Sequence, residues 1–390
     1  MTTTQPEIKR APDCEAIAPL IELCKAGRLF EVQEWIAAGK PVNPPPIPTK
    51  GNRARSPLEI SIERGFHSLV QVLLRAGAVQ QPQGYDCPMN RALRARRLDI
   101  AQLFVEHGFD PRLVDMKEVF ATWDPQIMAY FIERGADIQQ GNPFAFAFCN
   151  RIRTALRLFK DCRERVPDLQ EQANIALRHH CKEGNLKWVS LMLWAGADPY
   201  KPGSENPDEV PDEEDHGLSA LGFAAIYRHF EVFELKPIRS KEANPQAGSI
   251  LSFLTTGDGL TALKRLLEKG VNPNDQENGN CSAIQSCLNE LGWARHFSYS
   301  WERDTNGRNL DTRDSRDRLK AIHLLAKHGA KWVPQGKYEM SSARRSLVYL
   351  KPDYTVEFAW IMSKYKACSL EHLQELLRTP TIKAHIAGHR

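Results

Sequence analysis

Apolar residues recur along this chain at helical spacing, separated by residues typical of turns. The clearest example is the stretch 56–78. Ser56 can cap a helix that begins at Pro57, and Gly65 tolerates the left-handed backbone that ends one. The stretch after Gly65 carries apolar residues at i, i+1, i+4 and i+5, namely Leu69, Val70, Leu73 and Leu74. We therefore predict two short helices joined by a tight turn, with Gly77 ending the second.

The same pattern comes back along most of the chain. With Gly65 as a register mark, equivalent marks fall at Gly27, Arg96, Trp123, Asn150, Gly184, Arg228, Asp258, Asp317 and Cys368. Nine of these ten frames carry an apolar residue eight places after the mark, and seven carry a glycine twelve places after it. One such hairpin is too small to bury its apolar face alone, so we expect the copies to stack.

These frames resemble ankyrin repeats. Ser56-Pro57-Leu58 stands where that family has Thr-Pro-Leu-His, and the family's closing Gly-Ala-Asp appears at 135–137 and 196–198. The resemblance covers roughly 18–380, although the family histidine is replaced in every frame and the spacing between marks is uneven. It implies an all-α, right-handed ankyrin-like solenoid of about ten helical hairpins with long insertions.

The expected organisation is a single array with irregular parts. It comprises a polar N-terminal segment (1–17), one solenoid (18–380) with an acidic loop insertion (199–216) and an excursion (291–316), and a polar tail (381–390). In the seventh frame, Lys236 and Pro237 fall on buried positions of the second helix. Because a helix-interior proline is costly, we expect that helix to be cut short.

The acidic loop concentrates negative charge. Its carboxylates are Glu205, Asp208, Glu209, Asp212, Glu213, Glu214 and Asp215. Seven carboxylates within eleven residues repel one another, so we expect an exposed, mobile segment that does not pack.

Composition narrows the class of protein. The net charge of +4 over 390 residues is small, which predicts no strong attraction to nucleic acid or anionic membranes. The first twelve residues lack an apolar run typical of a secretion signal, and no apolar run approaches the length of a membrane span. Nine cysteines without CxxC pairs are typical of reduced thiols. We therefore expect a cytoplasmic protein.

Candidate chemistry is sparse. His179-His180-Cys181 could suggest a metal site, but neighbouring helical residues point about 100° apart, so we expect His180 to face inward and His179 to lie near the groove. No nucleotide-binding loop, nucleophile elbow or paired-carboxylate motif is present in the sequence. We expect no enzyme activity, cofactor, metal or small-molecule substrate.

Two arginine-rich frames keep an alternative open. They contain Arg91, Arg94, Arg96 and Arg97, and Arg151, Arg153, Arg157, Lys160 and Arg163. These residues could meet phosphates in a nucleic-acid-associated adaptor. Their register places them on two different faces, however, which favours two solvated surfaces over one phosphate-binding patch.

Apolar residues at groove positions favour a protein partner. One and two places before a mark, first-helix side chains should face the concave groove, as expected for Arg94. Phe148, Ile226 and Tyr227 also fall there. Two alternatives stay open: the frame slips by one residue in the fifth and seventh units, or the acidic loop covers these side chains.

The function implied by the resemblance is protein–protein recognition. We expect a non-enzymatic module that binds a specific protein through its groove, with an acidic loop that would favour a basic partner. By resemblance alone, toxin neutralisation or a role in a defence locus is one biological setting for such a module.

Overall fold

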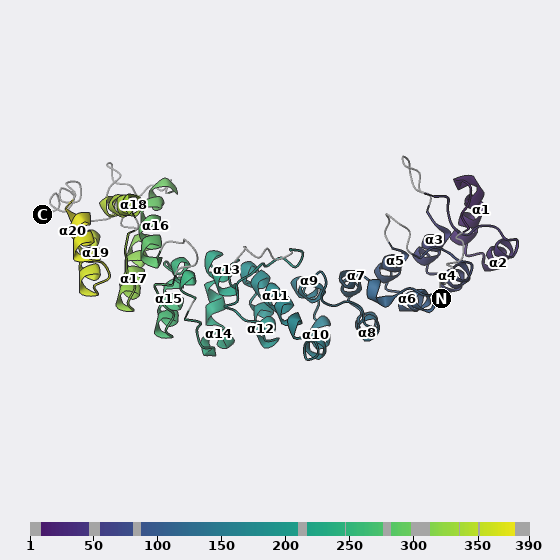
Figure 1. Ribbon diagram of the computed structural model, residues 1–390, viewed down its shortest axis with the longest axis horizontal. Coiled ribbons are helices and arrows are strands. Elements are labelled where there is room, and N and C mark those ends of the chain that lie inside the picture. The colour runs from purple at the N-terminus through teal and green to yellow at the C-terminus, as the bar shows by residue number, and fades with distance from the viewer. Residues whose placement is uncertain are drawn as a thin grey trace, which may run out of the picture. The chain divides into compact units, whose positions relative to one another are not determined.

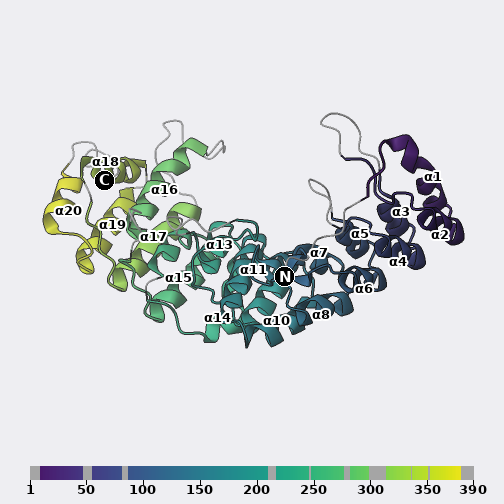
Figure 2. The ribbon, with the colours of Figure 1, turned by 45° about the vertical axis from the view of Figure 1, so that its right-hand side comes forward.

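The protein is built from short helices that stack as antiparallel hairpins (Figures 1 and 2). The computed structural model describes residues 9–46, 55–80, 87–209, 217–245, 247–275, 282–297, 313–334, 336–349 and 352–378. Within these residues, strand-type pairing is limited to one isolated bridge between Arg10 and Asn43. The all-α solenoid expected from the sequence is confirmed. The tail at 381–390 and acidic-loop residues 210–216 lie outside the described residues.

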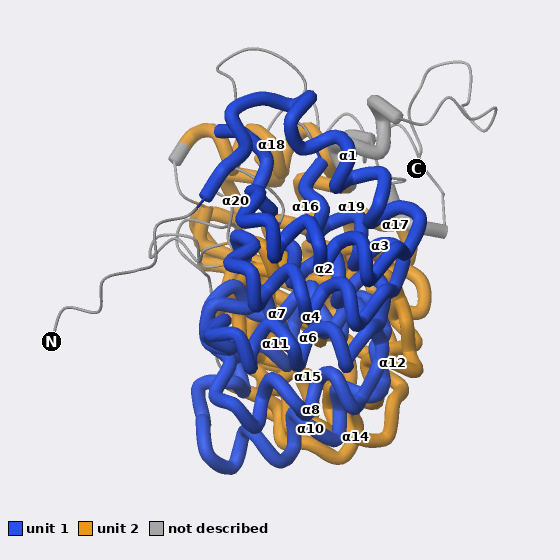
Figure 3. Tube along the Cα trace, turned by 90° about the vertical axis from the view of Figure 1, so that its right-hand side faces the viewer, with its two compact units in different colours: residues 1–173 blue, residues 174–390 orange. Residues whose placement is uncertain are grey.

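The chain divides into two compact units, Met1–Ala173 and Asn174–Arg390 (Figure 3). The expectation that residues 18–380 form a single continuous solenoid depends on how these two units join, so it stays a prediction. In unit 1 the hairpins are α1 (Cys14–Lys25) with α2 (Leu29–Ala37), α3 (Pro57–Glu63) with α4 (His67–Arg75), α5 (Pro88–Arg94) with α6 (Leu98–Glu106), α7 (Met116–Ala121) with α8 (Pro125–Glu133), and α9 (Pro143–Cys149) with α10 (Ala155–Arg163). Two 3-10 turns, η1 (Pro111–Leu113) and η2 (Pro167–Leu169), lie in its connections.

Unit 2 continues the same architecture. Its hairpins are α11 (Gln170–Glu183, whose first four residues belong to unit 1) with α12 (Leu186–Trp194), α13 (Ala220–Ile226) with η3 (Phe230–Glu234) and α14 (Lys236–Ser240), η4 (Gly248–Phe253) with α15 (Gly259–Glu268), α16 (Ala283–Phe297) with α17 (Arg313–Lys327), and α18 (Gly336–Tyr349) with α19 (Pro352–Lys364), followed by α20 (Leu370–Leu377). First helices pack on first helices and second helices on second helices, in both units.

Local sequence explains why the second hairpin forms. Ser56 accepts a hydrogen bond from the Glu59 backbone N–H (3.1 Å), and the Glu59 carboxylate accepts one from the Ser56 backbone N–H (2.9 Å). This reciprocal capping box starts α3 at Pro57. The predicted stripe of α4 is buried as expected, with Leu69 and Leu73 almost inaccessible to solvent.

The register marks coincide with left-handed backbone. Positive φ occurs at Gly27, Gly65, Arg96, Trp123, Gly184 and Arg228, the six residues that the sequence pattern marks in those frames. In the fifth hairpin the left-handed residue is Arg151 (φ +64), one place after the expected Asn150. In the eighth hairpin the left-handed residue is Gly257 (φ +54), one place before the expected Asp258, and the ninth mark, Asp317, lies inside α17. The turn between the two helices therefore sets the register in the first eight hairpins, and the fifth and eighth frames each slip by one residue.

Some marks are glycine for a second reason, which is space. A Cβ on Gly27 would lie 3.1 Å from the Phe66 ring, and one on Gly184 would lie 2.5 Å from His229 Nδ1. In each pair the second residue directly follows the mark of the next hairpin in its unit. Glycine at the mark thus lets the next hairpin place a ring against the turn.

Amide side chains join the ends of successive hairpins. Asn43 donates to the Gly77 carbonyl (2.9 Å) and accepts from the Val79 backbone N–H (2.8 Å). Asn274 likewise donates to the Gly329 carbonyl (3.0 Å) and accepts from the Lys331 backbone N–H (2.6 Å). These contacts satisfy the backbone where second helices end, so the closing glycines are tied to the preceding hairpin.

The seventh hairpin departs from the expectation for Lys236 and Pro237. Both residues are exposed, and the second helix is divided into η3 and α14. Pro237 lies in the first turn of α14, where its missing N–H costs nothing. The helix is cut short as expected, but the predicted burial of these two residues is wrong. Val232, Phe233 and Ile238 fill the core instead.

The C-terminal frames also differ from the expectation. The excursion at 291–316 begins as an extension of α16 to Phe297 and ends in α17, while 298–312 lies outside the described residues. The sequence pattern takes the helix around Leu376 as the last second helix. In the structure the last second helix is α19, which packs on the preceding second helix, α17. Helix α20 follows the last hairpin and packs on α18 and α19.

Candidate functional site

Among the first eight hairpins, the seventh differs from the others in the two residues that precede its left-handed turn residue. Most of these positions carry charged, polar or small residues, such as Lys25, Glu63 and Arg94. In α13 they carry Ile226 and Tyr227, which are 38% and 48% exposed. The mark Arg228 keeps its predicted register, so their exposure does not result from a frame slip. Large apolar groups are thus presented to solvent where the array normally places polar ones.

Phe148 is not part of this surface. It is fully buried, with its ring centroid 6.0 Å from Phe144 and 5.2 Å from Phe159. Because the fifth mark is Arg151, Phe148 stands three places before it, a position that is buried in every hairpin from the first to the eighth. The predicted role of Phe148 in a groove is wrong, because the one-residue slip turns it into the core.

Arg94 is half-exposed and engaged in an ion pair. Its Nε lies 3.2 Å from Glu118 Oε2 on the next first helix. The neighbouring Arg91 contacts Glu63 at 2.7 Å, and Arg97 binds Asp99 at 2.6 Å. The hydrogen bond from Arg97 lowers the pKa of Asp99. These three arginines are each paired with a carboxylate, so their positive charge is compensated within the protein. A phosphate-binding surface would need that charge to be uncompensated.

Lys182 joins the acidic loop to the aromatic surface in unit 2. Its Nζ donates to Glu205 at 2.6 Å and lies 5.6 Å from the centroid of the Tyr227 ring. The hydrogen bond with Glu205 raises the pKa of Lys182. Burial works to raise the pKa of Glu205, but the bond from Lys182 and nearby positive charge outweigh it and lower that pKa. Sequence reasoning missed Lys182, which looks like an ordinary polar groove residue.

The first part of the acidic loop is held in place. Arg178, only 1% exposed, donates from Nε to the Ser204 carbonyl (2.6 Å) and from Nη1 to the Lys201 carbonyl (3.2 Å). Tyr200, at the start of the loop, is also buried. The expectation of a segment that does not pack is therefore wrong for 200–205. Asp208 and Glu209 are exposed, and Asp212, Glu213, Glu214 and Asp215 lie outside the described residues.

Three side chains of α11 converge near the same place. His179 Nε2 lies 3.5 Å from Glu183 Oε1, and His180 Nδ1 lies 3.4 Å from Glu183 Oε2. His180 is fully buried and stacks on Trp188, with centroids 5.4 Å apart, whereas His179 is partly exposed. The predicted inward orientation of His180 is confirmed, and the placement of His179 near the groove stays a prediction. Their nitrogens nevertheless reach one carboxylate, which the 100° separation of helical neighbours did not suggest.

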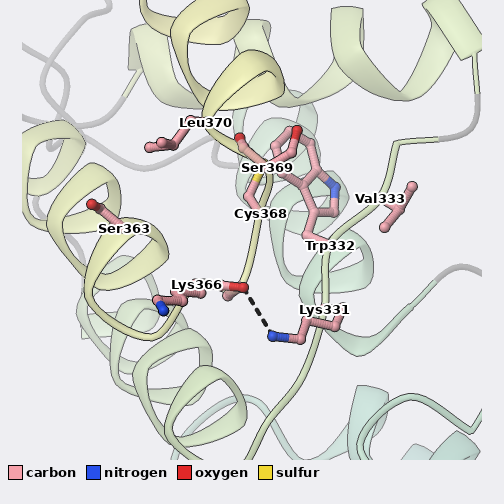
Figure 4. Close-up of a pocket in the computed structure, with 9 residues that line it drawn as sticks. Lys331, Trp332, Val333, Ser363, Lys366, Cys368, Ser369 and Leu370 are labelled. Carbon is pink, nitrogen blue, oxygen red and sulfur yellow. Dashed lines mark hydrogen bonds between the residues drawn. The ribbon is translucent and has the colours of Figure 1, made fainter.

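A separate hollow of about 580 Å³ lies near the C-terminal end of unit 2 (Figure 4). It is lined by the 331–333 connection and the turn between α19 and α20, including Lys331, Lys366 and Leu370. Lys331 Nζ donates a hydrogen bond to the backbone carbonyl of Lys366 at 2.9 Å, so one of the two lysines that line the hollow already has a partner. None of the candidate binding residues predicted from the sequence lines this hollow.

Similarity to known proteins is found among solved structures alone. No family model and no curated protein matches the chain. Among solved structures, the crystal structure of the human ASB11 ankyrin repeat domain is similar at 18% identity, covering 53% of this chain and 91% of that chain with a TM-score of 0.36. An alignment at that score does not define a fold, which here rests on the repeated hairpins and their left-handed turns. The architecture is ankyrin-like. None of the helices in the described residues has both the length and the apolar character needed to cross a membrane.

Proposed function

We propose that this ankyrin-like chain is a non-enzymatic scaffold that binds a protein through Ile226, Tyr227 and the adjoining acidic loop. An array of stacked hairpins presents extended surface, and that surface supports protein interaction in general. The observation that carries the proposal is the exposure of two large apolar neighbours at positions that are polar or small elsewhere. Exposed aromatic residues beside charged ones are typical anchors of protein interfaces.

The partner that fits is a protein segment with an apolar side chain flanked by basic residues. The sequence from 203 to 216 holds seven carboxylates and neither lysine nor arginine. Lys182 contacts both Glu205 and the Tyr227 ring, so the described start of this loop lies beside the apolar pair. Such charge steers a basic partner and speeds association more than it tightens the complex.

Binding to one dedicated protein would suit toxin neutralisation or a defence role, and we include both in the proposal on the strength of the ankyrin resemblance. We also propose a cytoplasmic location. No disulfide bond links any cysteines among the described residues, and Cys24, Cys181 and Cys287 are buried thiols. A reducing compartment is where such thiols persist.

The test compares two exposed aromatic residues of unit 2. Tyr227→Ala removes the proposed anchor, and Trp194→Ala removes a side chain that is 67% exposed on the second helix α12. A partner is first isolated by co-purification from the native source, and binding kinetics are then measured with purified components. We expect Tyr227→Ala to weaken binding by about 1 to 4 kcal/mol, mainly through faster dissociation, while Trp194→Ala leaves affinity unchanged.

Charge supplies a second arm of the same experiment. Neutralising Asp208 together with the carboxylates at 212–215 should slow association and flatten its dependence on salt. Wild-type affinity in a folded Tyr227→Ala protein, with a loss in Trp194→Ala, would move the interface to the second-helix face. Binding to duplex or single-stranded nucleic acid with a steep salt dependence would instead favour the adaptor alternative.

A further inference from the structure

The His179, His180 and Glu183 cluster goes beyond what the proposed function requires. All three lie on the last turns of α11, and their nearest nitrogen and oxygen atoms lie within 4.8 Å of one another. Among the described residues, this is the one group of three or more histidine, cysteine or acidic side chains that converges in this way. It combines two imidazoles with one carboxylate, a ligand set that zinc accepts in proteins.

The distances fit a metal shell better than hydrogen bonds. The two histidine nitrogens lie 3.5 and 3.4 Å from the Glu183 oxygens, longer than an N–H···O bond of about 2.7 to 3.2 Å. Two ligands held about 2.0 to 2.2 Å from a tetrahedral ion are about 3.3 to 3.6 Å apart. Since no pair exceeds 4.8 Å, side-chain rotations that move an atom by about 1.3 Å or less would close the shell.

The surroundings hold these groups in position. His180 is fully buried and stacked on Trp188, which restricts its ring. His179 and Glu183 are 28% and 39% exposed, so an ion could enter from solvent and keep one position open to water. Lys182, which directly precedes Glu183, directs its ammonium group to Glu205, where its charge is compensated.

We propose that His179 Nε2, His180 Nδ1 and the Glu183 carboxylate bind one Zn²⁺ ion, with the fourth position open to solvent. The competing explanation is a set of histidine–glutamate ion pairs that merely finish the helix. The two explanations differ in what the protein binds on its own, so this inference does not depend on any protein partner.

The chain offers a matched control for the test. His229 and Glu231 form another histidine–glutamate pair, 3.7 Å apart, outside the proposed three-ligand site. Zn²⁺ is titrated into the full-length, metal-free protein in competition with a chromophoric chelator. Glu183→Gln, His179→Ala and Glu231→Gln are measured alongside the wild type. Melting curves without metal show whether each variant is folded.

We expect one Zn²⁺ per chain in this competition. Glu183→Gln and His179→Ala should each weaken affinity by about 100-fold or more, since even second-shell changes at zinc sites cost 10- to 100-fold, and Glu231→Gln should leave it unchanged. Co²⁺ in the site should give a tetrahedral spectrum without a thiolate charge-transfer band. Absence of saturable binding, equal affinity in folded Glu183→Gln, or a thiolate band would each overturn the proposal.

Discussion

Replacing Gly184 by alanine tests the proposal that turn glycines make room for the next hairpin. Gly184 has φ +70, and an added Cβ would lie 2.5 Å from His229 Nδ1 and 2.8 Å from His229 Cγ. The second distance is close to the root of that side chain, so the ring cannot simply swing away. His229 Nε2 also contacts the Lys182 carbonyl at 3.1 Å, a bond that a displaced ring would lose.

The expected cost follows from four effects. A left-handed alanine costs about 1 to 2 kcal/mol, overpacking costs about 1 to 3 kcal/mol, and the lost hydrogen bond costs about 0.5 to 1.5 kcal/mol. Alanine also lowers the conformational entropy of the unfolded chain relative to glycine, which stabilises the folded state by about 0.4 to 1 kcal/mol. Gly184→Ala should therefore destabilise the protein by about 2 to 6 kcal/mol.

Gly270→Ala is the matched control in unit 2. Gly270 has φ +87, but an added Cβ would meet no atom within 4 Å. Only backbone strain and unfolded-state entropy apply there, so we expect a loss of about 1 kcal/mol. Because repeat arrays often unfold in parts, amide hydrogen exchange of α12 and η3 should accompany urea unfolding of the full chain. Equal losses in the two variants would refute the reasoning that His229 requires a glycine at 184.

Two further predictions concern buried groups. Arg178→Met should leave the carbonyls at 201–204 without their buried donor and cost about 1 to 3 kcal/mol, and limited proteolysis should then cut that segment faster than in the wild type. Burial raises the pKa of Cys24 to about 11 and that of Cys287 to about 12, so at neutral pH both should resist alkylation while exposed Cys14 reacts, as mass spectrometry can check.

The regular part of the fold could be predicted because short-range chemistry fixes it. Ser56 and Pro57 favour a helix start, and Gly65 favours a helix end, through contacts within a few residues. Arg96 and Trp123 could be placed at marks despite being poor left-handed residues, because the apolar positions after them kept their spacing. Periodicity therefore located the turns even where the turn residue itself gave no signal.

The parts that failed depend on a single residue of register or on distant contacts. Asn150 is the more favourable left-handed residue of the two, yet Arg151 takes that conformation, and the choice between them decides whether Phe148 is in the core or in the groove. Arg178 binding the loop at 201–204 pairs a helix with carbonyls more than twenty residues away. No local pattern encodes such a contact, so the loop appeared unstructured from its charge alone.

The seventh hairpin combines weak packing with exposed apolar side chains, and the two features have a common explanation. Its first helix buries mainly small residues, such as Ala220 and Ala224, and its second is divided at Leu235 between η3 and α14. In a stacked array, neighbouring hairpins supply interface energy that a weak member lacks. That support frees positions such as Ile226 and Tyr227 from stabilising the hairpin itself. Departures from the local rules are expected where a surface serves binding, which is why this hairpin is the strongest candidate for the partner's contact.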